Sequence, residues 1–275
     1  MKSRHLLSCF SIAGLLLSTS AFAGVKLTIE NTAASTSQTR TDTILLDRDR
    51  MSMTTGEGRM IFRDDQKTVW VLSDKRHGYV EITPQTMHQA QAAMEQAIKK
   101  LQEQMKSMPE DQRKKLEAMM EAELGQTASG QKAAESSVIY RKLGKSMTVR
   151  GWSCEMVERL VNGKKQADLC VARLDQVGLT PDDVKVFEDF FIFVRQAMPA
   201  SHHRTSLIDF EDLRKAVGYA AIPLDVTTYA DGKVVSHGVI KAIERSEIPP
   251  ETFEIPAGYQ KETMPKTDGG GAQPQ

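Results

Sequence analysis

The chain has 275 residues, and its 36 Lys and Arg balance its 36 Asp and Glu, so the formal net charge is zero. With 40% hydrophobic and 26% charged residues, the composition is that of a globular protein, which excludes the disordered and fibrous classes. Because no basic surplus is available to neutralise a phosphate backbone, the composition also argues against a protein that binds nucleic acid.

The first 23 residues have the features of a secretory signal peptide. Lys2 and Arg4 precede an apolar stretch over residues 6–17, and the segment closes with an Ala-Phe-Ala sequence that ends at Ala23. The apolar stretch is shorter than the roughly 20 residues that cross a bilayer, and no later segment is apolar enough, so we expect no transmembrane segment. The sequence predicts cleavage after Ala23 and a periplasmic or secreted mature protein.

The first part of the mature chain predicts an antiparallel meander. Val25, Leu27 and Ile29 alternate with polar residues, which is typical of a strand with one face in water. Four more strands are expected at residues 43–53, 58–63, 68–73 and 78–83. A stretch rich in Ser and Thr, residues 32–43, is expected to form either a polar strand or a loop.

A helical insertion is predicted over residues 84–125. Apolar residues here recur every three or four positions, at Met87, Ala90, Met94, Ala97, Ile98, Leu101, Met105 and Met108. This spacing predicts an amphipathic helix. A second helix is expected to begin near Pro109 and to end at Gly125, which would give a helical hairpin. The small, polar residues 126–136 are typical of a linker.

Cys154 and Cys170 lie on either side of a predicted β-hairpin. The Asn162-Gly163 pair between them is the strongest short signal for a two-residue turn. A strict two-residue turn does not place the cysteines opposite each other, so a bulge or a longer loop is needed if they face each other. Because export is expected and the sequence has no Cys-x-x-Cys, a structural disulfide is favoured over free or redox-active thiols.

The last third of the chain predicts two helices followed by strands. Residues 180–183 place Pro and two acids at the start of a helix that contains four phenylalanines and is therefore expected to be buried on most sides. Ser206 and Asp209 are candidate caps of a shorter helix that ends near Gly218. Strands are expected at residues 222–229 and 234–243, an extended segment at 253–256, and a disordered tail at 264–275.

These features together resemble a secreted bacterial family known as domain of unknown function 4412. The resemblance rests on the meander, the helical insertion, the cysteine hairpin and the sequence Phe-Glu-Ile-Pro-Ala-Gly-Tyr at residues 253–259. The family is similar in architecture to the LolA and LolB lipoprotein-localisation proteins. The resemblance implies an α+β fold, in which a curved antiparallel sheet forms an incomplete β-barrel and helices pack on its concave face over an apolar cavity. We expect a single domain of this kind over residues 24–263.

The sequence contains no recognisable catalytic or cofactor motif. It has no Gly-x-Ser-x-Gly elbow, no His-Glu-x-x-His and no glycine-rich phosphate loop. We therefore expect a protein that is not an enzyme and has no cofactor. Imidazole and thioether groups suited to copper occur at Met51, Met53, Met119, Met120, His202, His203 and His237. No spacing brings three of them together, so copper binding is a remote alternative and no metal site is predicted.

Six of the 14 methionines lie in the predicted helical hairpin. Flexible thioethers suit apolar surfaces that accept varied ligands, although packing of the helices on the sheet explains them as well. With the family resemblance, they predict a cavity for a lipid or acyl chain. Its expected lining is Trp70 of the sheet, Met94, Ile98, Leu101 and Met105 of one helix, and Phe187, Phe191 and Val194 of another. The alternative is an envelope interaction module whose Met-rich hairpin docks a protein partner.

Overall fold

The computed structural model describes residues 24–56, 58–114, 137–197 and 208–263, without the side chain of Met94. The strands are β1 (Gly24–Ala33), β2 (Thr39–Asp47), β3 (Arg50–Thr55), β4 (Gly58–Arg63), β5 (Thr68–Ser73), β6 (Gly78–Ile82), β7 (Val138–Val149), β8 (Trp152–Val161), β9 (Lys164–Arg173), β10 (Ala221–Ala230), β11 (Lys233–Ser246) and β12 (Gln260–Glu262). The helices are α1 (Pro84–Lys106), α3 (Pro181–Ala197) and α4 (Phe210–Val217), with short 3-10 helices η2 (Asp175–Val177) and η3 (Pro250–Phe253).

Several predicted segments fall outside this description. They are the signal peptide at 1–23, most of the second helix of the hairpin, the linker at 126–136 and the tail at 264–275. Of the second helix, residues 110–114 are described and are helical.

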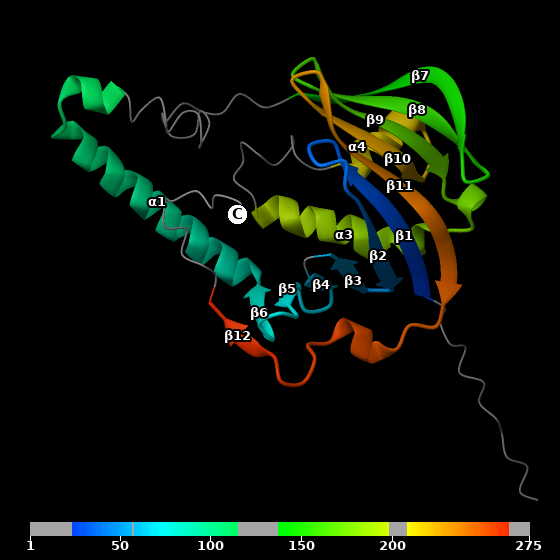
Figure 1. Cartoon of the computed structure of the whole chain (residues 1–275), viewed down its shortest axis with the longest axis horizontal. Coiled ribbons are helices and arrows are strands. Elements are labelled where there is room, and N and C mark those ends of the chain that lie inside the picture. Colours follow the sequence, from blue (N-terminus) through cyan, green and yellow to red (C-terminus); the bar gives the residue numbers. More distant parts are fainter. Residues whose placement is uncertain (1–23, 57, 115–136, 198–207, 264–275) are drawn as a thin grey trace, which may run out of the picture.

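The described strands form one sheet in the order β12-β6-β5-β4-β3-β2-β1-β11-β10-β9-β8-β7. Every neighbouring pair is antiparallel except β12 with β6, which is parallel. The sheet is curved and stays open, with β12 at one edge and β7 at the other (Figure 1). The predicted α+β class and the open, largely antiparallel sheet are therefore confirmed.

Strand β1 joins two meanders, β1–β6 and β7–β11. It pairs with β2 on one side and with β11 on the other, so that Val25 lies between Leu46 and Arg245. Val25 and Leu27 are each 1% exposed, because the alternation read from the sequence turns these side chains toward the core. The register with β11 shifts between Thr28 and Ile29, which is a β-bulge.

The segment predicted as one strand over residues 43–53 is instead a hairpin. Asp47 pairs with Arg50, and Arg48 in the turn between them has a φ of 50°. The side chain of Arg50 donates to that of Asp47 within the turn. Four consecutive charged residues prefer a solvent-exposed turn to a strand interior, which is the physical reason for the correction. Of the extended segment predicted at 253–256, Phe253 instead closes η3, and Glu254 after it has extended backbone angles.

The cysteine hairpin forms as predicted. Asn162 and Gly163 have φ angles of 50° and 75°, as the two-residue hairpin turn requires, and Cys154 is disulfide-bonded to Cys170. A bulge lies between Arg159 and Leu160 and pairs Cys170 with Met156. The cysteines are therefore diagonal neighbours on β8 and β9, with a Cα–Cα distance of 5.3 Å, and do not lie directly opposite each other.

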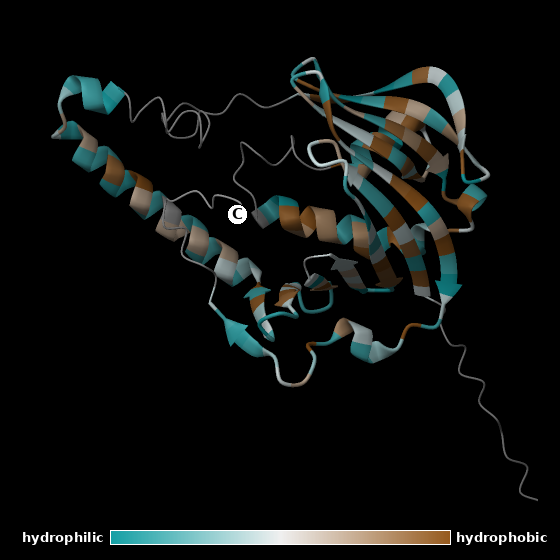
Figure 2. Ribbon diagram, in the orientation of Figure 1, coloured by the Kyte–Doolittle hydropathy of each residue, from teal (hydrophilic) through white to brown (hydrophobic). Residues whose placement is uncertain are grey.

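The main core lies between α3 and the strands around β1. Phe62 of β4 contacts two phenylalanines of α3, with ring-centroid distances of 5.6 Å to Phe190 and 5.5 Å to Phe193. Much of α3 is apolar (Figure 2). Its burial is less complete than predicted, because Val184, Val186, Phe190 and Phe193 are buried, whereas Ile192 is 43% exposed. Helix α3 therefore covers one face of the sheet next to β2 and β3.

Helix α1 is arranged differently, because it extends away from the sheet (Figure 1). Thr83 caps its start: its side chain accepts from the backbone N–H of Thr86 at 3.2 Å. In the described part of the helix, Met87 in the first turn is the residue that joins the main core. The prediction that this helix covers the sheet is therefore met only at its first turn. Within the described ranges, no helix combines the length and the apolar character needed to cross a lipid bilayer.

Candidate ligand-binding hollow

A hollow of about 200 Å³ lies between α3 and the central strands, and we call it the apolar hollow. Its lining comes from β1, α3, α4, β10 and β11 and from Ile208, two residues before α4. The lining residues are Leu27, Ile29, Asn31, Phe187, Phe191, Ile208, Phe210, Ile222, Pro223, Leu224, Val226, Gly238 and Ile240. A surface of this composition offers apolar contact to a ligand, with few polar groups to satisfy.

Three phenylalanines form one wall of the apolar hollow. The ring of Phe187 stands 4.9 Å from that of Phe191 at an interplanar angle of 86°, and Phe210 lies within 5.6 Å of both. Phe187 and Phe191 stay half-buried, although both are large and apolar. Edge-to-face contacts of this kind hold aromatic rings in defined positions, so the wall is preformed.

Phe210 reaches this wall because the start of α4 is tightly held. Asp209 caps the helix by accepting from the backbone N–H groups of Glu211 and Asp212, each at 3.0 Å. Its own N–H donates to the hydroxyl oxygen of Tyr140 on β7 at 2.9 Å. Burial raises the pKa of Asp209, but these N–H donors and Arg195 outweigh burial and leave the pKa below its ordinary value. The predicted cap at Asp209 is thus confirmed, whereas Ser206 lies outside the described residues.

One polar side chain reaches the apolar hollow among the described lining residues, and it belongs to Asn31. Its Nδ2 donates to Oδ2 of Asp42 on the neighbouring strand at 2.6 Å. Asp42 is only 4% exposed and also accepts from Nε of Arg40 at 3.2 Å. The one polar side chain at the apolar hollow among the described lining residues, that of Asn31, is therefore hydrogen-bonded to a buried carboxylate.

Part of the predicted cavity lining meets at the apolar hollow. Phe187 and Phe191 line it, and Val194 packs against the main core beside them. Trp70 does not reach it. On β5, Val69 belongs to the main core, whereas Trp70 packs on the other face of the sheet with its cross-strand partner Ile61. The indole Nε1 of Trp70 donates to Glu81 at 3.1 Å.

The predicted contribution of α1 is also absent from the apolar hollow. Ile98 and Leu101 are half-buried and Met105 is buried, but none of them lines it, and the side chain of Met94 lies outside the description. In their place stand residues of β1, β10 and β11 and Phe210, which the sequence analysis did not assign to a site. The sequence predicts strands in these regions and a helix start near Phe210, but β1 and β11 are more than 200 residues apart, so no local signal shows that they line one site.

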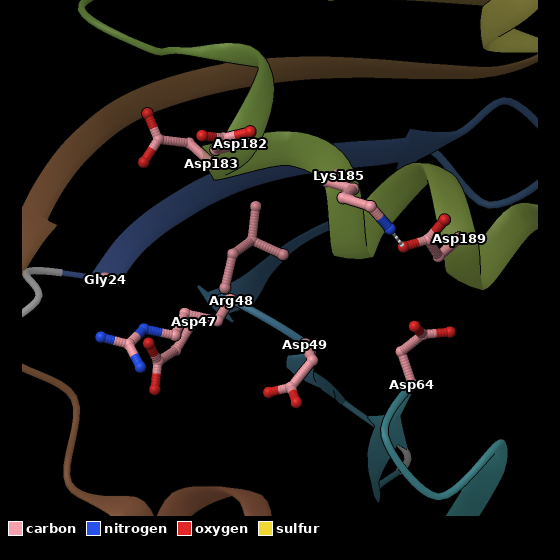
Figure 3. Close-up of a pocket in the computed structure, with 10 residues that line it drawn as sticks. Gly24, Asp47, Arg48, Asp49, Asp64, Asp182, Asp183, Lys185 and Asp189 are labelled. Atoms are coloured by element: carbon pink, nitrogen blue, oxygen red, sulfur yellow. Dashed lines mark hydrogen bonds and ion pairs between the residues drawn. The ribbon is translucent and has the colours of Figure 1, made fainter.

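A second hollow, of about 360 Å³, has the opposite character, and we call it the acidic hollow (Figure 3). It is lined by Gly24, Leu46, Asp47, Arg48, Asp49, Asp64, Asp182, Asp183, Lys185 and Asp189. Much of this charge is paired: the side chain of Lys185 donates to Asp189, and this bond raises the pKa of Lys185 above its ordinary value. In the described ranges no three His, Cys, Asp or Glu residues are arranged to hold a metal ion.

The residues of the copper alternative are dispersed. Met51 is fully buried and Met53 packs against the same main core, while His237 Nε2 is 2.9 Å from Oδ2 of Asp225. Met119, Met120, His202 and His203 lie outside the described residues.

Comparison with known proteins places the chain in a family. A sequence profile of the family described as "Domain of unknown function (DUF4412)" matches residues 97–259, which is more than half of the chain. The chain belongs to this family. A search of curated proteins finds no match to this DUF4412 member.

Solved structures show distant similarity to this DUF4412 member. An uncharacterized conserved protein from Thermus thermophilus has 8% identity and a TM-score of 0.44, covering 88% of this chain and 91% of that one. PNGF-II has 6% identity and a TM-score of 0.37, covering 87% of this chain and 31% of its own. MucB has 10% identity and a TM-score of 0.34, covering 84% of this chain and 56% of its own.

Proposed function

We propose that this DUF4412 member is an exported, non-catalytic protein that binds an apolar ligand, part of a lipid or an acyl chain, in the apolar hollow. As part of this proposal, α3 covers the concave face of the sheet. The observation that carries it is the aromatic wall: Phe187 and Phe191 border a space that the core does not fill. A cavity of about 150 Å³ lined by Leu, Ile and Phe binds benzene, so a hollow of about 200 Å³ suits an alkyl segment of similar size.

Export is part of this proposal and is supported by the Cys154–Cys170 disulfide, which is the kind of bond that persists in oxidising compartments. N-terminal sequencing of the protein isolated from its native cell is expected to start at Gly24. Retention of Met1 in a cytosolic fraction would contradict export.

Binding can be tested with a hydrophobic fluorescent probe and a variant that fills the apolar hollow. Ile29 is half-buried and lines it, so Ile29→Phe adds apolar volume where space exists. We expect the wild type to bind the probe, an alkyl lipid to displace it, and Ile29→Phe to weaken probe binding at least tenfold. The matched control is Val235→Phe on β11, at a residue that is 43% exposed and outside the lining.

A second variant changes the volume in the opposite direction. Phe191→Ala removes part of the aromatic wall and enlarges the apolar hollow, so bulkier probes are expected to bind more tightly while the protein still melts cooperatively. Equal probe binding by the wild type, Ile29→Phe and Val235→Phe would refute binding at this place.

The envelope interaction module remains the second candidate function, favoured by the position of α1. This helix extends away from the sheet, with Ile98 and Leu101 half-buried on it (Figure 1). If α1 docks a protein partner, Ile98→Glu combined with Leu101→Glu is expected to abolish crosslinking between α1 and that partner in intact cells. The same variant should leave probe binding in the apolar hollow unchanged, which distinguishes the two functions.

A further inference from the structure

The amide of Asn31 has a defined orientation at the edge of the apolar hollow. Its nitrogen donates to Asp42 Oδ2 at 2.6 Å. The flipped amide would place its oxygen against the carboxylate oxygen, and two acceptors repel each other. The nitrogen is therefore committed to Asp42, and Oδ1 is the atom left for a ligand.

Gly238 allows this oxygen to reach the lining. It is the cross-strand partner of Asn31 on β11 and itself lines the apolar hollow. A Cβ at position 238 would lie 2.6 Å from Oδ1 of Asn31, which is closer than such atoms approach. The missing side chain thus leaves room for the amide oxygen over the backbone of β11.

The carboxylate of Asp42, to which Asn31 is bonded, bears on the charge of the ligand. Asp42 is buried, and its second oxygen, Oδ1, has no hydrogen-bond partner in the described part of the chain. Its cation, Arg40, is 54% exposed at the side chain, so solvent weakens the compensation. An anionic head group near Asn31 would meet an acceptor oxygen and, behind it, a buried negative charge.

We propose that Asn31 selects the ligand of the apolar hollow: an alkyl chain that ends in a hydrogen-bond donor, a hydroxyl or an ammonium group, in preference to a carboxylate. This inference rests on the proposed function and adds the chemical class of the ligand. The alkyl chain lies against Phe187 and Phe191, and the donor group binds Oδ1 of Asn31. Asp42 acts as a positioning residue, because it holds the amide of Asn31.

Displacement of the fluorescent probe by four eight-carbon compounds tests this class. Octanol and octylammonium are expected to displace the probe at concentrations at least tenfold lower than octanoate requires. The concentration of octane that displaces the probe is expected to lie between those of octanol and octanoate. If octane and octanoate bind as tightly as octanol, the inference is wrong while the proposed function stands. If none of the four displaces the probe from the wild type, both fail.

Two variants separate selection by Asn31 from the general cost of burying a carboxylate. Asn31→Leu is expected to weaken octanol binding about tenfold, to the level of octane, without weakening octane. Asp42→Asn allows the Asn31 amide to turn. It is expected to reduce the preference for octanol, measured as the affinity for octanol divided by the affinity for octanoate. This test remains even if Asn31→Leu fails to fold. Thr32→Val is the control, since Thr32 follows Asn31 on β1 and bonds to Thr39 instead. The inference would be overturned if Asp42→Asn kept the wild-type ratio of octanol affinity to octanoate affinity, or if a folded Asn31→Leu bound octanol as tightly as the wild type.

Discussion

Arg245 on β11 binds Asp183 in the first turn of α3 through two hydrogen bonds, of 2.5 and 2.6 Å. Asp183 also accepts from the N–H and the hydroxyl of Thr180, each at 2.7 Å, which completes the start of the helix. This contact therefore fixes the beginning of α3 against the sheet. Phe187 and Phe191 follow on the next two turns, so the ion pair also sets where the aromatic wall stands.

Removal of Arg245 is expected to destabilise the fold. Arg245→Ala leaves Asp183, whose side chain is 9% exposed, without its cation, and we expect a loss of about 1–3 kcal/mol in the free energy of unfolding. Urea denaturation measures this loss. The control is Lys26→Ala, since the Lys26–Glu244 pair nearby is exposed on both sides and should contribute less than about 0.5 kcal/mol. Equal effects of the two substitutions would contradict this role for Arg245.

The same carboxylate predicts a dependence of stability on pH. Burial raises the pKa of Asp183, but the hydrogen bonds from Arg245 and Thr180 outweigh it and leave the pKa below the ordinary value of 3.8. Because the folded pKa is the lower one, this stabilisation is complete above about pH 4 and is lost as the pH falls through the folded pKa. Asp183→Asn is therefore expected to be less stable than the wild type at pH 7, and this gap is expected to narrow as the pH is lowered from about 4 to about 2. A constant gap across this range would refute the assignment.

The disulfide is expected to make a measurable contribution to stability. The cysteines are separated by 16 positions, and closing a loop of this length stabilises a protein by about 3 kcal/mol through the entropy of the unfolded chain. Replacing both Cys154 and Cys170 by Ser should lower the free energy of unfolding by about this amount. Thiol labelling of the denatured, unreduced wild type should modify neither cysteine. Labelling of both would show that the bond is absent.

The position of Trp70 can be tested by fluorescence. Phe253 is fully buried in the cluster that contains Trp70, so Phe253→Ala is expected to cost about 3–5 kcal/mol and to shift the Trp70 emission to the red. A Trp152→Phe background isolates this signal. Probe binding in the apolar hollow should be unchanged, because Trp70 packs on the other face of the sheet. Loss of probe binding in a variant that still melts cooperatively would instead support a cavity that includes Trp70.

Local sequence signals determined most of the elements of this protein. The alternation of Val25, Leu27 and Ile29 predicted β1, Asn162-Gly163 predicted the hairpin turn, and Asp209 predicted the start of α4. Each of these signals acts within a few residues, through side-chain period, backbone φ or a capping bond, and needs no distant partner.

The site itself was decided by tertiary structure. Alternation shows which residues of a strand share a face, but it does not show which strand lies beside it or which face a helix covers. The run Val69-Trp70-Val71-Leu72 is apolar at every position, so nothing local indicated that Trp70 faces away from α3. The pairing of Asn31 with Gly238 joins residues 207 positions apart, and only this long-range register places the amide oxygen at the apolar hollow.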